Sequence, residues 1–360
     1  MLSADTRNSG SIIVWTAPRE LIRCPHFLGG TMRTLLVLTT LSAVACGSNM
    51  SSNSGDDANS NPIDAPGTTG DPVAFEVKST DFTLTAGTEV TKCFYFTTSN
   101  TDTVAIHKWT SMMTTGSHHM IVFLNPPGVT QPPDGTIDSN CSVGNASGGA
   151  QPIWTYASQT AGTLQTEDLP VNDGAGKPLA QNIAAHTSGY IQMHYLNPGD
   201  TDLTVNVDLK AYALPTGTAY TQTEAYITYQ YQINIPAGAT NVVVPGSCPV
   251  PAGVKFWQLS THAHKQAVDT QVKDGTSMVF ESMDWEHPGS KLFDPAFYAF
   301  GAPKLNWQCT YNNTGDNAGH AITQGASAQT NEMCMATGYM FPATAPQFCV
   351  GLGPTNCQCL

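Results

Sequence analysis

Apolar and polar residues alternate in short runs along the chain from Pro72 onward. The clearest runs are residues 75–77, 82–84, 203–209 and 226–231. Alternation with a period of two predicts strands that bury one face. The runs are separated by Gly- and Pro-rich segments typical of turns, at residues 126–128, 132–135, 198–200, 236–238 and 251–253. The pattern therefore predicts an all-β protein built from β-sandwich or jelly-roll domains.

Residues 72–351 span about 280 positions, which is long for a single sandwich, so we expect two tandem domains. The segment 214–217, which contains Pro and Gly, is the predicted boundary. It divides the region into an N-terminal domain, residues 72–214, and a C-terminal domain, residues 215–351. Residues 352–360 are then expected to be a tail.

The composition agrees with turns and short strands. Only 11% of the residues are charged, and the chain has 32 Gly and 24 Pro among its 360 residues. Long amphipathic helices need more charged residues than this. The net charge of −13, without a cluster of Lys and Arg, argues against nucleic acid as a partner.

The segment from Met32 to Cys46 has the features of a bacterial signal peptide. One Arg precedes an apolar run, residues 35–44, and small residues lead to Cys46 in the lipobox-like order Ala-Val-Ala-Cys. The run is too short to cross about 30 Å of hydrocarbon. We therefore expect residues 32–46 to be a lipoprotein signal peptide. Lipid on Cys46 would attach the protein to a membrane without a spanning helix.

The segments on either side follow from this assignment. Residues 1–31 are expected to be a non-native extension, with Met32 as the alternative start. Residues 47–71 are rich in Ser, Asn, Asp and Gly and are expected to be a disordered linker. Gly47 follows the lipidated cysteine, where an Asp would indicate retention in the inner membrane. The expected location is therefore extracytoplasmic, at the outer membrane.

Two pairs of histidines are candidate metal ligands. His262 and His264 lie in a strand-like run, where residues i and i+2 point to the same face and form a metal-binding pair. Two surface histidines near a strand end are the alternative. His118 and His119 are adjacent, so both reach one metal only if the backbone bends, which the preceding turn-like residues permit.

His194 and Met333 complete two sets of ligands with different chemistry. Each of them, taken alone, is more typical of core packing. Copper(II) favours imidazole, whereas thioether sulfur favours copper(I). A site of three histidines and a site of two histidines and a methionine would therefore hold two copper ions with different redox behaviour.

Four motifs around these residues resemble the copper type II, ascorbate-dependent monooxygenases, the family of the peptidylglycine α-hydroxylating and dopamine β-type enzymes. The motifs follow the family's order at roughly its spacing, and the resemblance extends over residues 72–351. They are Gly116-Ser117-His118-His119-Met120, Gln192-Met193-His194-Tyr195, Thr261-His262-Ala263-His264 and Asn331-Glu332-Met333-Cys334. The resemblance implies two jelly-roll domains whose copper ions face each other across a cleft, which agrees with the strand pattern.

The resemblance also assigns the ligands and the reaction. The electron-transfer copper would be held in the N-terminal domain by His118, His119 and His194. The oxygen-binding copper would be held in the C-terminal domain by the catalytic set His262, His264 and Met333. The implied reaction hydroxylates a C–H bond of a small organic substrate with O₂ and with ascorbate or a similar one-electron donor.

The chain has ten cysteines, and a secreted protein meets an oxidising compartment. The resemblance implies three disulfides: Cys93–Cys141, Cys248–Cys349 and Cys309–Cys334. The last of these would restrain the loop of the methionine ligand. Cys357 and Cys359 have no counterpart in the family and are left to bridge another segment or another chain.

The sequence departs from the peptide-hydroxylating members where those enzymes hold their substrate. Ser260 stands in place of an Arg, and Met335 and Thr337 stand in place of an Asn and a Tyr. A guanidinium is the usual clamp for a carboxylate, so its loss argues against a peptide-glycine substrate.

Two other functions compete with the monooxygenase. A non-catalytic copper-binding lipoprotein would retain the same ligands without hydroxylase activity. Zinc hydrolysis is the weaker rival, because no His-Glu-x-x-His motif supplies a carboxylate base and because a thioether ligand is unusual for zinc.

Overall fold

A computed structural model describes residues 71–139, 141 and 152–359. They belong to one compact unit, Asp64–Leu360. The predicted N-terminal extension, the signal peptide, the lipidated Cys46 and all of the predicted linker except Asp71 lie outside the described residues. The described part contains strands and no α-helix, so the prediction of an all-β fold is confirmed. No helix suited to crossing a bilayer is found among these residues.

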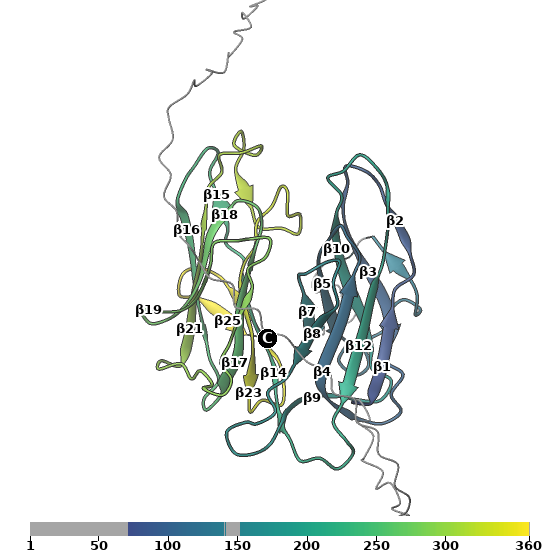
Figure 1. Cartoon of the computed structure of the whole chain (residues 1–360). Coiled ribbons are helices and arrows are strands. Elements are labelled where there is room, and N and C mark those ends of the chain that lie inside the picture. Colours follow the sequence, from purple (N-terminus) through teal and green to yellow (C-terminus); the bar gives the residue numbers. More distant parts are fainter. Residues whose placement is uncertain (1–70, 140, 142–151, 360) are drawn as a thin grey trace, which may run out of the picture. The chain divides into compact units, whose positions relative to one another are not determined.

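The first half of the described chain forms two main sheets (Figure 1). Its strands are β1 (Val73–Lys78), β2 (Phe82–Leu84), β3 (Glu89–Thr97), β4 (Val104–Met113), β5 (Ser117–Leu124), β6 (Ile137–Asp138), β7 (Ile153–Ser158), β8 (Gln165–Asp168), β9 (Leu179–Ile183), β10 (Ser188–Leu196), β11 (Leu203–Val205), β12 (Val207–Ala213) and β13 (Thr221–Gln222). One sheet has the order β1-β12-β4-β9-β13, with β8 also paired to β4, and the other has the order β6-β3-β10-β5-β7. Strands β11 and β2 form a separate pair.

The second half repeats this arrangement with two further sheets. Its strands are β14 (Glu224–Gln230), β15 (Asn234–Ile235), β16 (Val242–Pro249), β17 (Lys255–Ala263), β18 (Ala267–Asp274), β19 (Ser277–Ser282), β20 (Ser290–Leu292), β21 (Lys304–Tyr311), β22 (Ile322–Thr323), β23 (Cys334–Phe341), β24 (Gln347–Gly351) and β25 (Cys357–Cys359). The orders are β20-β17-β23-β14-β24-β25 and β16-β21-β18-β19, with β15 and β22 as a separate pair.

The strand β12 shows how the alternating sequence produces a sandwich. Its residues alternate between buried and partly exposed, and its buried face packs in one core cluster with Ile191 of β10 and Val122 of β5. The same cluster includes Trp257 and Tyr339 of the second half. The apolar core therefore continues from the first sandwich into the second.

The strands β5 and β10 are buried on both faces. One face of β10 contributes Ile191, Met193 and Tyr195 to the core, and the other face carries Gln192 and His194, which are also buried. Two-sided burial explains why these strands lack the alternation seen in β12. Polar side chains on the second face are thereby removed from water, which sets the conditions for the candidate site.

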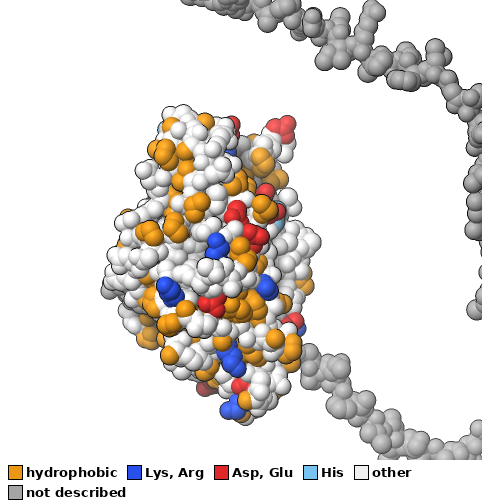
Figure 2. All heavy atoms as spheres, turned by 90° about the vertical axis from the view of Figure 1, so that its left-hand side faces the viewer, with side chains coloured by type: hydrophobic (Ala, Val, Ile, Leu, Met, Phe, Trp, Pro, Cys, Tyr) orange, Lys and Arg blue, Asp and Glu red, His pale blue; other side chains and the backbone are white. Residues whose placement is uncertain are grey.

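The surface reflects the low content of charged residues. On the face in Figure 2, Lys and Arg side chains lie apart from one another among hydrophobic and uncharged polar side chains.

The position of β13 shows that the first sandwich extends further than the sequence indicated. This strand pairs with β9, so the first half's sheet reaches Gln222, beyond the boundary predicted at residues 214–217.

Four disulfides connect the strands and loops. They are Cys93–Cys141, Cys309–Cys334, Cys248–Cys357 and Cys349–Cys359. This number of disulfides is typical of an extracytoplasmic protein.

The predicted pair Cys248–Cys349 is wrong, and so is the prediction of a C-terminal tail. Residues 357–359 form β25, which pairs with β24 so that Cys359 lies directly opposite Cys349. The sulfur atoms of Cys248, Cys349 and Cys357 lie within 4.8 Å of one another. Cys349 and Cys357 are therefore both within reach of Cys248. Because the chain returns as β25, Cys349 pairs with Cys359, and Cys248 pairs with Cys357.

Glu224 of β14 gives a test of how burial affects stability. Burial raises the pKa of Glu224 to about 7, although a hydrogen bond from Gln222 opposes this shift. The folded state then retains a proton that the unfolded state loses above about pH 4.5, so stability falls as the pH rises from about 4.5 to 7. We expect Glu224→Gln to raise the free energy of unfolding by about 1–3 kcal/mol at pH 8 and to leave it unchanged at pH 4.

Urea denaturation at the two pH values measures this difference. An equal effect at pH 4 and pH 8 would show that the substitution acts through packing and not through ionisation.

Candidate metal centre

A β-bulge brings His118 and His119 toward the same site. In the pairing of β5 with β10, His194 lies opposite His119, and Tyr195 lies opposite Ser117, so His118 is the extra residue. A bulge of this kind bends the strand and redirects its side chains. Gly116 precedes it with a φ of 92°, a backbone conformation that favours glycine. The bend that the sequence permitted is therefore present.

The three histidines of the first half converge. Nitrogen atoms of His118, His119 and His194 all lie within 4.8 Å of one another, and the three residues are buried. The ring centroids of His118 and His119 are 5.0 Å apart, and those of His119 and His194 are 4.9 Å apart. The structure thus brings the predicted three-histidine set together.

The ligand set of the second half lies on adjacent strands. His262 is near the end of β17, His264 follows that strand, and Met333 immediately precedes β23, the partner of β17. The rings of His262 and His264 have centroids 5.3 Å apart. All three residues line one cavity of about 40 Å³, together with His119 and His194.

The two ligand sets are in direct contact, which is closer than the cleft implied by the resemblance. The ring centroid of His262 lies 5.3 Å from that of His119 and 6.2 Å from that of His118. The core shared by the two sandwiches accounts for this closeness. Five imidazoles therefore form one continuous buried cluster with Met333 at its edge.

Hydrogen bonds select which ring nitrogen of two histidines faces a metal. The Nε2 atom of His194 lies 2.7 Å from Oε1 of Glu89, and the Nδ1 atom of His264 lies 3.1 Å from the carbonyl oxygen of Asn331. A nitrogen that donates such a bond carries the proton, so its opposite nitrogen has the free lone pair. Nδ1 of His194 and Nε2 of His264 are therefore the atoms suited to ligation.

Two other ring nitrogens are buried without a partner. Nε2 of His118 and Nδ1 of His119 have no hydrogen bond to any residue that the structure describes. Burying a polar atom unsatisfied is unfavourable, and a metal ion would compensate for it. These two unpartnered nitrogen atoms are the observation that shows that the residues fit a metal ion.

The electrostatic environment keeps four histidines of the cluster neutral: His118, His119, His262 and His264. Burial, reinforced by neighbouring histidines, lowers the pKa of His118 to about 3 and the pKa values of His119 and His262 well below the ordinary value. Burial also lowers the pKa of His264 to about 4, although its bond to Asn331 opposes the shift. Neutral imidazoles present lone pairs to a metal at physiological pH.

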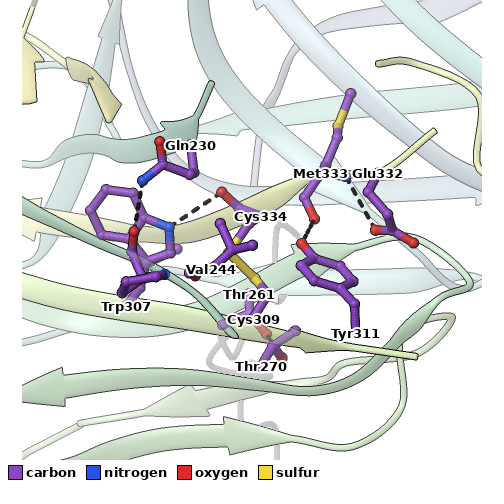
Figure 3. The surroundings of a disulfide bond; sticks show 12 residues. Gln230, Val244, Thr261, Thr270, Trp307, Cys309, Tyr311, Glu332, Met333 and Cys334 are labelled. Carbon is purple, nitrogen blue, oxygen red and sulfur yellow. Dashed lines mark hydrogen bonds between the residues drawn. A yellow bond between two sulfur atoms is a disulfide. The ribbon is translucent and has the colours of Figure 1, made fainter. Parts of the chain in front are cut away.

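The segment of Met333 is held from three sides (Figure 3). The hydroxyl of Tyr311 donates to the carbonyl oxygen of Met333 at 2.6 Å, and Cys334 is bonded to Cys309. The Glu332 side chain is fully buried and accepts hydrogen bonds from the backbone N–H groups of His264, at 2.9 Å, and Gln266, at 2.8 Å. Glu332 thus connects the methionine segment to the histidine that shares its site.

Glu89 connects the ligand sets of the two halves. It accepts from the backbone N–H of Ala328 at 2.9 Å and from the hydroxyl of Ser327 at 3.1 Å, in addition to its contact with His194. Burial opposes ionisation of Glu89, but its hydrogen bond and electrostatic interaction with His194, together with the bonds from Ala328 and Ser327, lower its pKa overall. A charged carboxylate therefore joins a first-half ligand to the loop that leads to Met333.

Sequence reasoning missed Glu89, Glu332 and Tyr311. Glu332 was part of a recognised motif, and an acidic residue directly before the proposed methionine ligand is a signal that could have identified it. Glu89 meets Ala328 across 239 positions of the chain. No local pattern contains that information.

A second, larger cavity of about 530 Å³ lies beside the cluster, and His262 lines both cavities. Ser260 and Thr337, two positions where the sequence departs from the peptide-hydroxylating enzymes, line this larger cavity. Met335, the third such position, lines the small one.

No protein-family model matches the chain. No curated protein matches it either. A similar solved structure is PNGase F, a glycosylasparaginase from Flavobacterium meningosepticum, at 8% identity and a TM-score of 0.31. The match covers 75% of this chain and 96% of that chain, and similarity at this level bears on neither activity nor substrate.

Proposed function

We propose that this protein is a copper-dependent monooxygenase that hydroxylates a C–H bond of a small organic substrate, with O₂ and with ascorbate or a similar one-electron donor. The observation that supports the proposal is the convergence of five imidazoles and one thioether. They come from distant segments and form one buried cluster with two orphaned ring nitrogens. The order of the four sequence motifs supports the same family of enzymes.

The chain's residues divide into two ligand sets. His118, His119 and His194 would hold one copper, and His262, His264 and Met333 would hold the other. Copper in these sites supplies one-electron transfer and the activation of O₂ for insertion of oxygen into a C–H bond. The thioether of Met333 favours the cuprous state, whereas three imidazoles suit both oxidation states.

The protein contributes orientation and exclusion of water. Glu89 and the carbonyl of Asn331 fix the ring orientations of His194 and His264. The histidines of the cluster are all buried, so reactive species formed there would be shielded from water. The adjoining cavity of about 530 Å³ offers a place for a substrate beside His262.

Glu89 and Glu332, the two carboxylates that hold the ligand segments, are not free to act as the base of a zinc hydrolase. A hydrolase would need a free carboxylate as a general base. Glu89 is engaged with His194, Ser327 and Ala328, and Glu332 is engaged with backbone N–H groups. Both carboxylates therefore have structural partners that occupy their oxygen atoms.

We further propose that the protein is anchored by lipid on Cys46 at the outer membrane, outside the cytoplasm. The signal-peptide pattern of residues 32–46 supports the anchor, and the four disulfides agree with an oxidising compartment. Mass spectrometry of the membrane fraction would detect the acylated N-terminal peptide.

Metal analysis combined with oxygen uptake tests the proposed activity. We expect two copper ions per chain and O₂ consumption that requires both ascorbate and a C–H donor. The variant His119→Ala should lose the copper of the three-histidine set and, with it, the O₂ uptake. Two coppers without substrate-coupled uptake would instead identify a copper-binding lipoprotein, and zinc in place of copper would overturn the proposal.

A further inference from the structure

The cavity of about 530 Å³ is built by both halves of the described chain. Trp154, Tyr156 and Glu167 come from strands β7 and β8 of the first half, and Ser260 and Tyr339 come from β17 and β23 of the second. Its volume is within the range of small-molecule sites, about 300–1,000 Å³. Because His262 is also part of its lining, a molecule bound here would lie next to the imidazole cluster.

Aromatic residues form a fixed part of the wall. Tyr156 stacks on Trp109 with ring centroids 5.4 Å apart, and Tyr339 stacks on Trp257 at 5.0 Å. Tyr156 shares a 2.9 Å hydrogen bond with Ser111. Tyr339 donates to the carbonyl oxygen of Thr155 at 3.3 Å. Both phenols are thus occupied, and their rings remain as a rigid apolar surface beside Trp154.

The polar part of the lining is rich in hydrogen-bond acceptors. Glu167 and Asp168 supply two carboxyl groups, and no Lys or Arg is among the lining residues. The half-buried Glu167 carboxyl has no hydrogen bond or ion pair with any residue of the described ranges. Oε1 of Gln159, also in the lining, is buried and has no partner there either.

An unpaired, half-buried carboxyl is unfavourable unless a ligand compensates it. Burial raises the pKa of Glu167 to about 8. Burial and the nearby Glu167 carboxyl also raise the pKa values of Tyr156 and Tyr339. A cation next to Glu167 would stabilise its ionised form and satisfy oxygen atoms that the protein leaves free.

We propose that this cavity binds an organic ammonium ion, with Glu167 as the counter-ion and the aromatic wall around the apolar part of the molecule. An ammonium group donates hydrogen bonds to Glu167 and Gln159, and the ring faces of Trp and Tyr attract cations. A carboxylate would meet the acidic side chains of Glu167 and Asp168 and no guanidinium, since Ser260 occupies the position of the family's Arg. Only the further step, that this amine is the molecule hydroxylated, rests on the proposed monooxygenase function.

Equilibrium binding to the whole chain as purified tests the proposal without requiring turnover. The probes are benzylamine, benzyl alcohol and benzoate, which share a ring and differ in charge, measured by isothermal titration calorimetry at neutral pH. We expect benzylamine to bind about tenfold more tightly than benzyl alcohol, and benzoate to bind more weakly than both. Glu167→Gln should remove the preference for the amine and leave the affinity for the alcohol unchanged.

The control variant Asp200→Asn removes one negative charge from an exposed loop and should retain the preference. Circular dichroism would verify that each variant is folded. Equal affinity for amine and alcohol, stronger binding of benzoate, absence of binding by all three probes, or an amine preference that survives in Glu167→Gln would each overturn the proposal. If the preference is present but the amine does not stimulate O₂ uptake, the proposed oxidation fails while the ammonium site stands.

Discussion

Met333→Ile is expected to abolish substrate-coupled O₂ uptake and to reduce the copper content from two ions per chain to one. Met333 provides the thioether of the second ligand set, and isoleucine has a similar volume but no ligand atom, so packing is preserved while this set loses its soft donor. The three-histidine set does not include residue 333, and its copper should remain. Metal analysis and an oxygen electrode measure the two results on the same sample.

Met335→Ile is the matched control for metal content. This methionine is buried two positions away and lines the same small cavity, but it lies on β23 beyond the proposed ligand. We expect the variant to retain two coppers. Full uptake by Met333→Ile, or loss of both coppers, would show that the proposed division of the ligands is wrong.

Glu89→Gln is expected to weaken copper binding at His118, His119 and His194 by about 10–100-fold. Glu89 is the acceptor that fixes the proton of His194 on Nε2 and leaves Nδ1 for the metal. A glutamine has the same length, and its amide oxygen can still accept from His194 and Ala328 while its nitrogen donates to Ser327 Oγ, but the acceptor of the His194 proton is then neutral. The orientation of His194 would then no longer be fixed by a charged acceptor.

Competition with a chromophoric copper chelator measures this loss of affinity. Glu76→Gln is the control, because Glu76 also pairs with a base, Lys210, but at 3.3 Å on the exposed surface. It should leave copper affinity unchanged, as exposed ion pairs contribute little. An unaltered affinity in Glu89→Gln would mean that Glu89 serves only to join the two halves.

The two cavities beside His262 extend this picture. The small one is lined by five of the six proposed ligands and has room for little else, whereas the larger one combines aromatic rings with the unpaired Glu167. Selection of the bound organic molecule and binding of the metal are thus assigned to different side chains. The expected effects of Glu167→Gln and Met333→Ile are accordingly separable, one in binding and the other in metal content.

Local sequence determined the all-β class and the candidate ligands. The start of strand β12 was predictable from the run 203–209, because alternation with period two reports burial of one face directly. The pairs His118-His119 and His262-His264 were recognisable because ligand types at short spacing are visible in the chain itself.

Only the tertiary structure decided how these residues meet. The bulge at His118 depends on the register between β5 and β10, and the partner of Cys248 depends on the return of β25. Glu89 and Glu167 act through contacts with segments far away in the chain or through burial by them. Such contacts are set by the packing of whole sheets against one another, and a pattern of neighbouring residues does not encode them.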